Sequence, residues 1–175
     1  MVVLRDMKLS DVDDYVRWFT TDVEWMRTDA PWETEISSEE DERKSWNEYF
    51  KSVQGTPDDA VRWKYELELD GRHIGWVSRY TYLEYLDNPD DIPAVGIDIP
   101  ESDVWGKGVG TEALRQYIEY LRGRGVRSFY MQTWAGNLAI LRVAKKLGFQ
   151  EFSRKEGHRI VDGEAYDAIT LRLDL

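Results

Sequence analysis

A glycine-rich stretch, VWGKGVGTEAL, constrains the fold of this chain more than any other feature. It follows a short, largely apolar segment, AVGIDIP, which is typical of a strand in the centre of a sheet. It leads into residues 109–122, whose apolar side chains recur at helical spacing. A strand, a glycine loop and a helix in this order predict a parallel crossover, with backbone N–H groups gathered at the start of the helix.

Periodicity along the rest of the chain predicts one α/β domain, residues 1–175, with a mixed sheet of about seven strands flanked by about four helices. Residues 25–35 contain Pro31 and mixed polar side chains, so we expect a loop there. One helix is expected between the capping residues Asn137 and Gly148. The other helices are expected at 9–22, 37–53 and 109–122, and the strands at 2–7, 61–69, 73–86, 94–100, 126–134, 150–159 and 164–173.

The charge balance excludes several classes of function. The chain carries a formal net charge of −11, and its excess of acidic residues lies in the first hundred positions. Nucleic acids need a basic face, so we expect no nucleic-acid partner; a cationic acceptor is compatible with these acids, although solubility alone also explains most of them. No apolar run reaches the ~20 residues that span a bilayer, and the first residues do not form a secretory signal. We therefore expect a cytoplasmic protein without a membrane partner.

The cysteine and histidine content argues against a thiolate nucleophile and against a metal site. There is no cysteine, which removes thiolate nucleophiles and sulfur ligands and fits a reducing compartment. The two histidines, His73 and His158, lie far apart and in no metal-ligand or triad spacing. We expect both to be ordinary strand residues, and we expect no structural metal.

The glycine loop allows three phosphate-binding interpretations, and its register excludes two of them. A nucleotide P-loop needs Ser or Thr after its Gly-Lys pair, but Gly108 follows Lys107. A dinucleotide fingerprint needs G-x-G-x-x-G, whereas Gly106, Gly108 and Gly110 are spaced G-x-G-x-G. The third interpretation is a metal-free cradle of N–H groups for a pyrophosphate. A plain strand-to-helix turn, with glycines for packing, stays open beside it.

A second motif lies one strand further on. The segment NLAILRVAKKLGF, taken together with WGKGVGTEAL, resembles the GNAT superfamily of acyl-CoA-dependent N-acyltransferases, and most closely its RimJ/RimL-type subgroup. The GID before the loop is also similar to aminoglycoside 6′-N-acetyltransferases. The resemblance covers residues 94–173 well and the earlier residues mainly in the order of elements. It implies an acyl-CoA-binding half at 94–175 and an acceptor-side half at 1–93.

The resemblance also implies where acetyl-CoA binds. The superfamily loop [RQ]-x-x-G-x-[GA] matches residues 105–110, with Trp105 in place of the usual Arg or Gln. Asn137 matches the residue that caps the second motif helix, and Arg142 is a weaker candidate that is equally compatible with a surface charge. The implied cofactor-binding residues are Ile97, Ile99, Trp105, Gly106, Lys107, Gly108, Val109, Gly110, Thr111, Asn137 and Arg142.

Direct acyl transfer to an amine needs a group that accepts a proton and donors that hold the carbonyl oxygen. Backbone N–H groups near residues 97–99 are the donors that the resemblance implies. Asp98 alternates with two isoleucines on a central strand, where an acid is costly unless it is paired or functional. The similarity to aminoglycoside 6′-N-acetyltransferases, in which an Asp at this place is a proposed base, implies a catalytic or amine-binding role for it. A structural pair with an Arg or a Tyr stays open beside this role. Glu84 and Glu101 are weaker candidates. The position of the family's tyrosine acid is Ala144, so that hydroxyl is missing.

The first half of the chain is expected to form the acceptor pocket. The candidates are aromatic and acidic side chains that suit an ammonium group, although each is also compatible with an ordinary core or surface role. They are Trp25, Asp29, Trp32, Tyr80, Tyr82 and Glu84.

These features together predict an acetyl-CoA-dependent N-acetyltransferase acting on a primary amine. The amine is left open between a small cationic amine or aminoglycoside-like compound, a protein N-terminus and a free amino acid. A non-catalytic acyl-CoA-sensing module is the alternative, supported by the missing tyrosine, and a nucleotide enzyme is disfavoured by the loop. The sequence does not set the oligomeric state, although exposed strands could support a homodimer.

Overall fold

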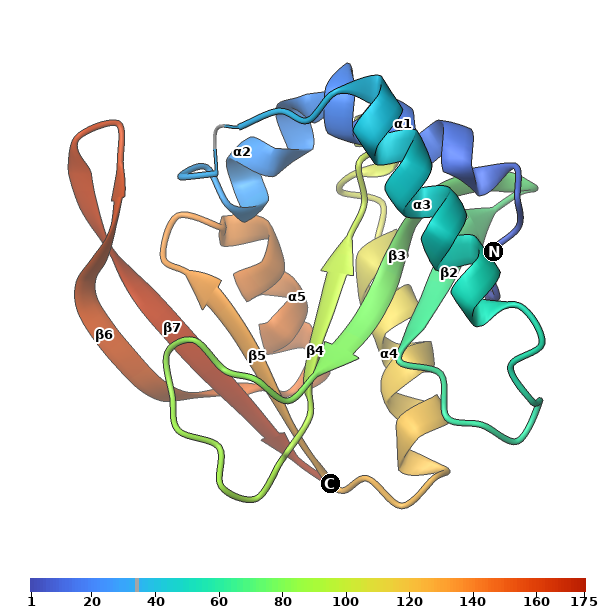
Figure 1. Ribbon diagram of the computed structural model, residues 1–175. Coiled ribbons are helices and arrows are strands. Elements are labelled where there is room, and N and C mark those ends of the chain that lie inside the picture. Colours follow the sequence, from blue (N-terminus) through green and yellow to red (C-terminus); the bar gives the residue numbers. More distant parts are fainter. Residues whose placement is uncertain (34) are drawn as a thin grey trace.

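The computed structural model, which describes residues 1–33 and 35–175, is built around one seven-stranded mixed sheet (Figure 1). Its spatial order is β1-β2-β3-β4-β5-β7-β6, so the strand of AVGIDIP lies in the middle, as predicted. The strands are β1 Val2–Arg5, β2 Lys64–Leu69, β3 Arg72–Tyr80, β4 Ala94–Asp98, β5 Ser128–Trp134, β6 Gln150–Val161 and β7 Glu164–Asp174.

Helices cover both faces of the sheet. Trp76 and Val77 are consecutive on β3 and therefore point to opposite faces. Trp76 packs in an aromatic cluster with α1 and α3, and Val77 packs in the larger core with α4 and α5. The helices are α1 Asp11–Thr20, α2 Met26–Asp29, α3 Glu39–Val53, α4 Val109–Arg122 and α5 Leu138–Leu147, with 3-10 turns η1 Val23–Trp25 and η2 Ser102–Val104.

The prediction of a loop over residues 25–35 is wrong at its start, because η1 ends there at Trp25 and α2 follows. Trp25 is buried, and its indole N–H donates to the Trp18 carbonyl over 3.0 Å. The Ala30 N–H donates to the Met26 carbonyl and closes the turn of α2. The anchor is a tertiary contact with α1, which local composition does not encode.

Five predicted strands are too long, and two of them exceed the observed strand by three residues or more. The strand expected at 61–69 begins at Lys64, and the one expected at 73–86 ends at Tyr80. Beyond Tyr80, the Asn88 side chain donates to the carbonyls of Thr81 and Ile92 and holds the chain as a loop instead.

The centre of the sheet opens next to β4. This strand pairs with β3 along its whole length, but with the parallel β5 only at Ala94 and Tyr130. The crossover helix α4 begins at Val109 and ends at Arg122, as predicted. Among the residues that the structure describes, the edge of β4 that faces β5 therefore has no strand partner beyond Ala94.

No helix among the described residues has both the length and the apolar character needed to cross a membrane.

Candidate active site

The glycines of the loop are required by its backbone. Gly106 and Gly108 have φ values of 73° and 83°, in the left-handed region, and a Cβ at either position would meet no atom within 4 Å. Gly108 is the N-cap of α4 and has no side chain to accept a hydrogen bond. The first N–H groups of α4, from Val109 to Thr111, therefore lack helical acceptors and face outward as an anion-binding end.

Trp105 ties the loop to the end of β4. Its indole N–H donates to the Ile99 carbonyl over 2.7 Å, and its ring is partly exposed beside the glycines. This contact gives the departure from the usual Arg or Gln a structural role, since it fixes the loop against the strand that carries Asp98.

The second motif forms the opposite wall. The Asn137 carboxamide oxygen accepts from the Ile140 N–H over 3.2 Å and caps α5, as predicted. At the other end, Gly148 adopts the left-handed conformation, with φ of 91°. Arg142 and Lys146 lie on the side of α5 that faces the glycine loop across a cavity.

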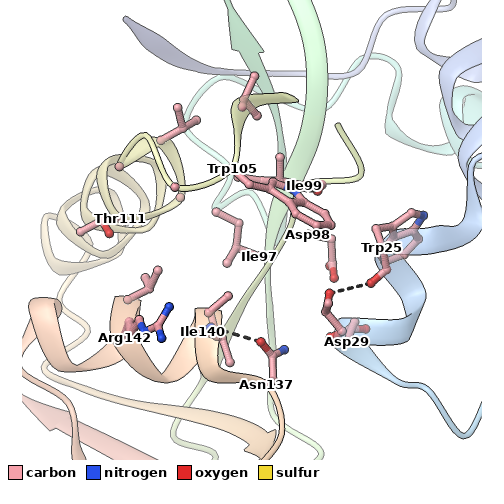
Figure 2. Close-up of a pocket in the computed structure, with 18 of the residues that line it drawn as sticks. Trp25, Asp29, Ile97, Asp98, Ile99, Trp105, Thr111, Asn137, Ile140 and Arg142 are labelled. Carbon is pink, nitrogen blue, oxygen red and sulfur yellow. Dashed lines mark hydrogen bonds between the residues drawn. The ribbon is translucent and has the colours of Figure 1, made fainter. Parts of the chain in front are cut away.

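One cavity of about 320 Å³ joins these elements (Figure 2). It runs from the glycine loop and α5, past the open end of β4, to η1 and α2. The predicted site residues that it brings together are Trp25, Asp29, Ile97, Asp98, Ile99, Trp105, Gly106, Gly108, Val109, Gly110, Thr111, Asn137 and Arg142. Side chains that sequence analysis did not single out complete the lining, namely Thr28, Val104, Ala139, Ile140, Val143 and Lys146.

Six predicted residues do not line this cavity, namely Trp32, Tyr80, Tyr82, Glu84, Glu101 and Lys107. Trp32 packs edge-to-face on Trp134 and lies under the Arg159 guanidinium. Glu101 accepts from the Arg17 guanidinium and the Trp18 indole. Lys107 and Tyr82 are exposed, the latter by 83%. Glu84 accepts from Arg159 over 2.6 Å in an ion pair. Tyr80, on β3, lies beside Gly96 of the neighbouring strand β4. Burial and the carboxylates of Asp29 and Asp98 raise the pKa of the Tyr80 hydroxyl to about 12. Tyr80 is thus near Asp29 and Asp98 although it does not line the cavity.

Asp98 points to the face of the sheet away from α4. Its register partner is Trp76, and Figure 2 shows its carboxyl directed toward the segment that carries Trp25 and Asp29. Burial raises the pKa of Asp98 well above its ordinary value, and the nearby Asp29 carboxylate raises it further, while Lys64 opposes both. A carboxyl of this kind accepts a proton at higher pH than an exposed aspartate does.

The cation that acts on Asp98 is Lys64, which sequence analysis did not single out. Its ammonium lies over four aromatic rings, at 4.3 Å from the centroid of Tyr15, 4.5 Å from Trp46, 4.9 Å from Trp76 and 5.0 Å from Tyr49. Burial lowers the pKa of Lys64 to about 8, although nearby acids oppose this shift. Such a cage holds a cation through the faces of its rings. A single lysine in a strand of alternating polar and apolar residues gives no sign in the sequence that aromatic rings will enclose it.

Comparison with known proteins identifies the family of this chain. A family model described as an acetyltransferase (GNAT) domain matches residues 2–150. The chain belongs to this family. A curated relative, an uncharacterized N-acetyltransferase of Methanocaldococcus jannaschii, is 26% identical over 114 residues, which cover 62% of this chain and 47% of that protein. The chain thus spans about half the length of that relative.

Solved structures share the fold of this GNAT chain. RimJ of Mycobacterium smegmatis, in complex with a CoA disulfide, has a TM-score of 0.75 at 18% identity, with 99% of this chain and 81% of that chain covered. The putative acetyltransferase yncA of Salmonella typhimurium, with its cofactor acetyl-CoA, has a TM-score of 0.72 at 18% identity, covering 100% and 94%. The predicted α/β fold of this superfamily is confirmed.

The position of the family tyrosine lies in the core of this GNAT domain. Ala144 is 1% exposed and packs against the larger hydrophobic cluster. Of the α5 residues that line the cavity near it, Ile140 and Val143 are apolar, and Arg142 and Lys146 are cationic. Among the described lining residues there is no tyrosine, so the cavity offers no phenol at this wall.

Gly75 is a further site-shaping residue that sequence analysis missed. It lies on β3 with φ of 151°, beside an irregularity in the β2–β3 pairing. A Cβ there would lie 2.1 Å from the Asp98 carbonyl oxygen and 3.0 Å from Ile99 Cα. A single glycine inside a strand pattern is the signal for such a close backbone approach.

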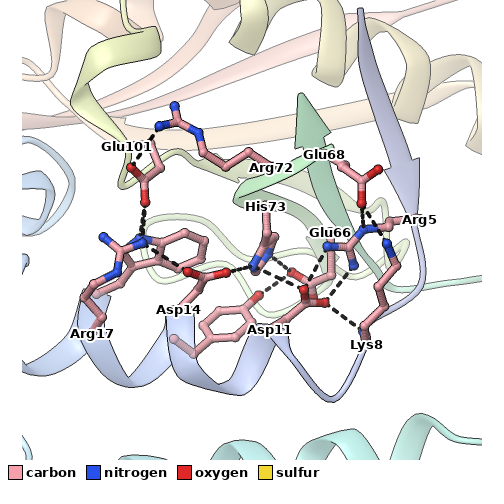
Figure 3. Close-up of polar contacts among 12 residues, drawn as sticks. Arg5, Lys8, Asp11, Asp14, Arg17, Glu66, Glu68, Arg72, His73 and Glu101 are labelled. Atoms are coloured by element: carbon pink, nitrogen blue, oxygen red, sulfur yellow. Dashed lines mark hydrogen bonds and ion pairs between the residues drawn. The ribbon is translucent and has the colours of Figure 1, made fainter. Parts of the chain in front are cut away.

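His73 lies on a strand, β3, as the sequence predicts, but it is buried and its ring nitrogens contact acidic side chains. Its Nδ1 lies 3.1 Å from Asp14 and its Nε2 lies 3.0 Å from Glu66 (Figure 3). Asp11, Asp14 and His73 offer ligand atoms within 4.8 Å of one another, as in a metal site. However, the Arg5 guanidinium donates to both Asp11 oxygens, so these atoms are engaged in an ion-pair network.

Proposed function

We propose that this protein is an acetyl-CoA-dependent N-acetyltransferase that transfers the acetyl group directly to a primary amine. The observation that carries the proposal is a single cavity that joins an anion-binding helix end to a half-buried carboxyl on the open central strand. The end of the cavity at the helix suits a phosphate-bearing acetyl donor. The end at the carboxyl suits an amine that must lose a proton.

The residues present fit the donor. The free N–H groups at the start of α4 suit a pyrophosphate, and Arg142 and Lys146 add positive charge on the opposite wall. The unpaired edge of β4 beside Ile97 and Ile99 offers backbone groups to the amides of the pantetheine arm. Relatives of the same fold were solved with acetyl-CoA or a CoA disulfide, which supports this assignment.

The chemical step follows from the groups in the cavity. The amine nitrogen attacks the thioester carbonyl carbon, a C–N bond forms, the C–S bond breaks, and CoA leaves as the thiolate. Asp98 accepts the proton that the amine loses. Backbone N–H groups of β4 near residues 97–99 stabilise the carbonyl oxygen as charge develops. With Ala144 at the tyrosine position, the thiolate takes its proton from water.

The test separates binding from turnover. Acetyl-CoA or CoA at a hundredfold excess over Kd should stabilise the protein by about 2.7 kcal/mol, seen as a rise in Tm, whereas ATP and NAD should not. Release of CoA thiol in the presence of primary amines should follow. No stabilisation by either CoA species would contradict the proposal. Stabilisation without thiol release across an amine panel would instead favour the acyl-CoA-sensing module.

A further inference from the structure

The acceptor end of the cavity holds two carboxylates that come from different elements. Asp98 reaches it from β4, and Asp29 reaches it from the end of α2 (Figure 2). Trp25 and Thr28 line the same end. The indole anchor of Trp25 on α1 and the Thr28 hydroxyl, which donates to the Trp25 carbonyl over 2.8 Å, fix the position of Asp29.

Neither carboxylate has a hydrogen-bonded cation among the residues that the structure describes. The pKa of Asp29 is raised to about 6 by partial desolvation in the cleft and by Glu33, and that of Asp98 is raised by burial and by Asp29. The cation that acts on Asp98 is engaged elsewhere. Lys64 is enclosed by its aromatic rings and lies 3.7 Å from Glu66.

Charge is divided between the two ends of the cavity. Arg142 and Lys146, the cationic side chains that line it, are both on α5 at the donor end. Among the described residues that line the acceptor end, the charged ones are Asp29 and Asp98. The Lys64 ammonium acts on Asp98 from within its aromatic cage and does not line the cavity. A ligand that fills this end with positive charge therefore relieves the repulsion between the two carboxylates, whereas an anionic ligand adds to it.

We propose that the acceptor carries two cationic groups, so that one amino group reacts beside Asp98 while the second is bound by Asp29. This inference rests on the proposed acetyl transfer and narrows its acceptor to small diamines and polyamines. An acceptor that carries a carboxylate, such as a free amino acid, meets two like charges and is rejected. A peptide N-terminus with no other cation leaves Asp29 unpaired.

The experiment compares acceptors that differ by one charged group. CoA thiol release is measured with the full chain for cadaverine, pentylamine, putrescine, butylamine, lysine and a neutral peptide with a free N-terminus. A bound charge contact of this kind is worth about 10- to 100-fold, so each diamine should exceed the matched monoamine in kcat/KM by that factor. Lysine, which is cadaverine with an added carboxylate, should fall below cadaverine by a similar factor.

Variants assign the preference to a residue. Asp29→Asn should reduce the ratio of diamine to monoamine kcat/KM to about one, and Asp29→Glu should keep part of it. Glu24→Gln is the matched control, because it removes one negative charge from an exposed residue of η1 near the same segment. Its ratio should equal that of the wild type. The rise in Tm with acetyl-CoA shows that each variant is folded.

Equal kcat/KM values for diamines and monoamines, or a wild-type ratio in Asp29→Asn, would overturn the inference while leaving the acetyltransferase activity standing. Preference for the neutral peptide over both diamines would do the same and would point to a protein N-terminus. Absence of thiol release with every amine would overturn the proposed activity, and the inference with it.

Discussion

Asp98 illustrates how a single residue acquires chemistry from its surroundings. The residue is an ordinary aspartate on a short strand, flanked by two isoleucines that point to the other face. Burial and Asp29 raise its pKa, while the caged Lys64 restrains the shift. The uncharged form dominates at low pH, so the proton-accepting form accumulates only as the pH rises through this raised pKa.

Replacement of this carboxyl tests its role directly. Asp98→Asn should lower kcat by about 10²- to 10⁴-fold, since it removes the proton acceptor, and should abolish the rise of kcat/KM with pH that the wild type shows. The rise in Tm with CoA should be retained. Asp59→Asn, in an exposed turn, is the control and should behave as the wild type. Unchanged turnover in Asp98→Asn would exclude Asp98 as the base.

At the scale of elements, the contact between β3 and β4 sets the position of the site. Gly75 brings β3 so close to the Asp98 carbonyl that no side chain fits between them. The Trp105 indole holds the same end of β4 through its hydrogen bond to the Ile99 carbonyl. The strand that carries the candidate base is therefore fixed by two contacts, neither of which lies in the cavity's acceptor end.

Gly75→Ala should lower stability by more than the ~1–3 kcal/mol expected for backbone strain alone, because β4 must move away from the new Cβ. Turnover should fall with it, since Asp98 is displaced. Gly163→Ala is the matched control: it also has a left-handed φ, of 81°, but a Cβ there meets no atom within 4 Å. Denaturant unfolding of the two variants measures the difference. Equal losses would show that the close contact at Gly75 is unimportant.

At the scale of the whole molecule, a polar network joins helix α1 to strands β2 and β3. His73 lies between Asp14 and Glu66, and the Tyr15 hydroxyl donates to Glu66 over 2.6 Å. Burial alone would lower the pKa of His73, but its hydrogen bonds to Asp14 and Glu66 outweigh burial and raise it. The folded protein therefore favours the protonated imidazole, which offsets part of the buried acidic charge.

This linkage predicts how stability depends on pH. Because the folded-state pKa lies above the unfolded value of 6.5, the contribution of His73 is complete below pH 6.5 and is lost as the pH rises through the folded-state pKa. In that window the stability advantage of the wild type over His73→Gln should shrink by up to about 1.4 kcal/mol per pH unit. Unfolding free energies measured at several pH values give both slopes. Parallel slopes would contradict the assignment.

Local patterns in the sequence predicted the fold and the geometry of the glycine loop and of the α5 caps. Helix α4, the Asn137 and Gly148 caps of α5 and the central place of β4 all depend on residues close in sequence, whose spacing and φ preferences are readable. The glycine loop belongs to this class, since Gly106 and Gly108 serve the backbone itself.

Only the tertiary structure decided which side chains surround Asp98 and Lys64. It placed Asp29 opposite Asp98, put Lys64 inside an aromatic cage, surrounded His73 with acids and left Tyr82 exposed. These arrangements join elements far apart in the chain, and their energies come from burial and from charges that meet only after folding. A sequence determines which charges a chain carries, but the fold determines which of them share a cavity and how far water is excluded from it.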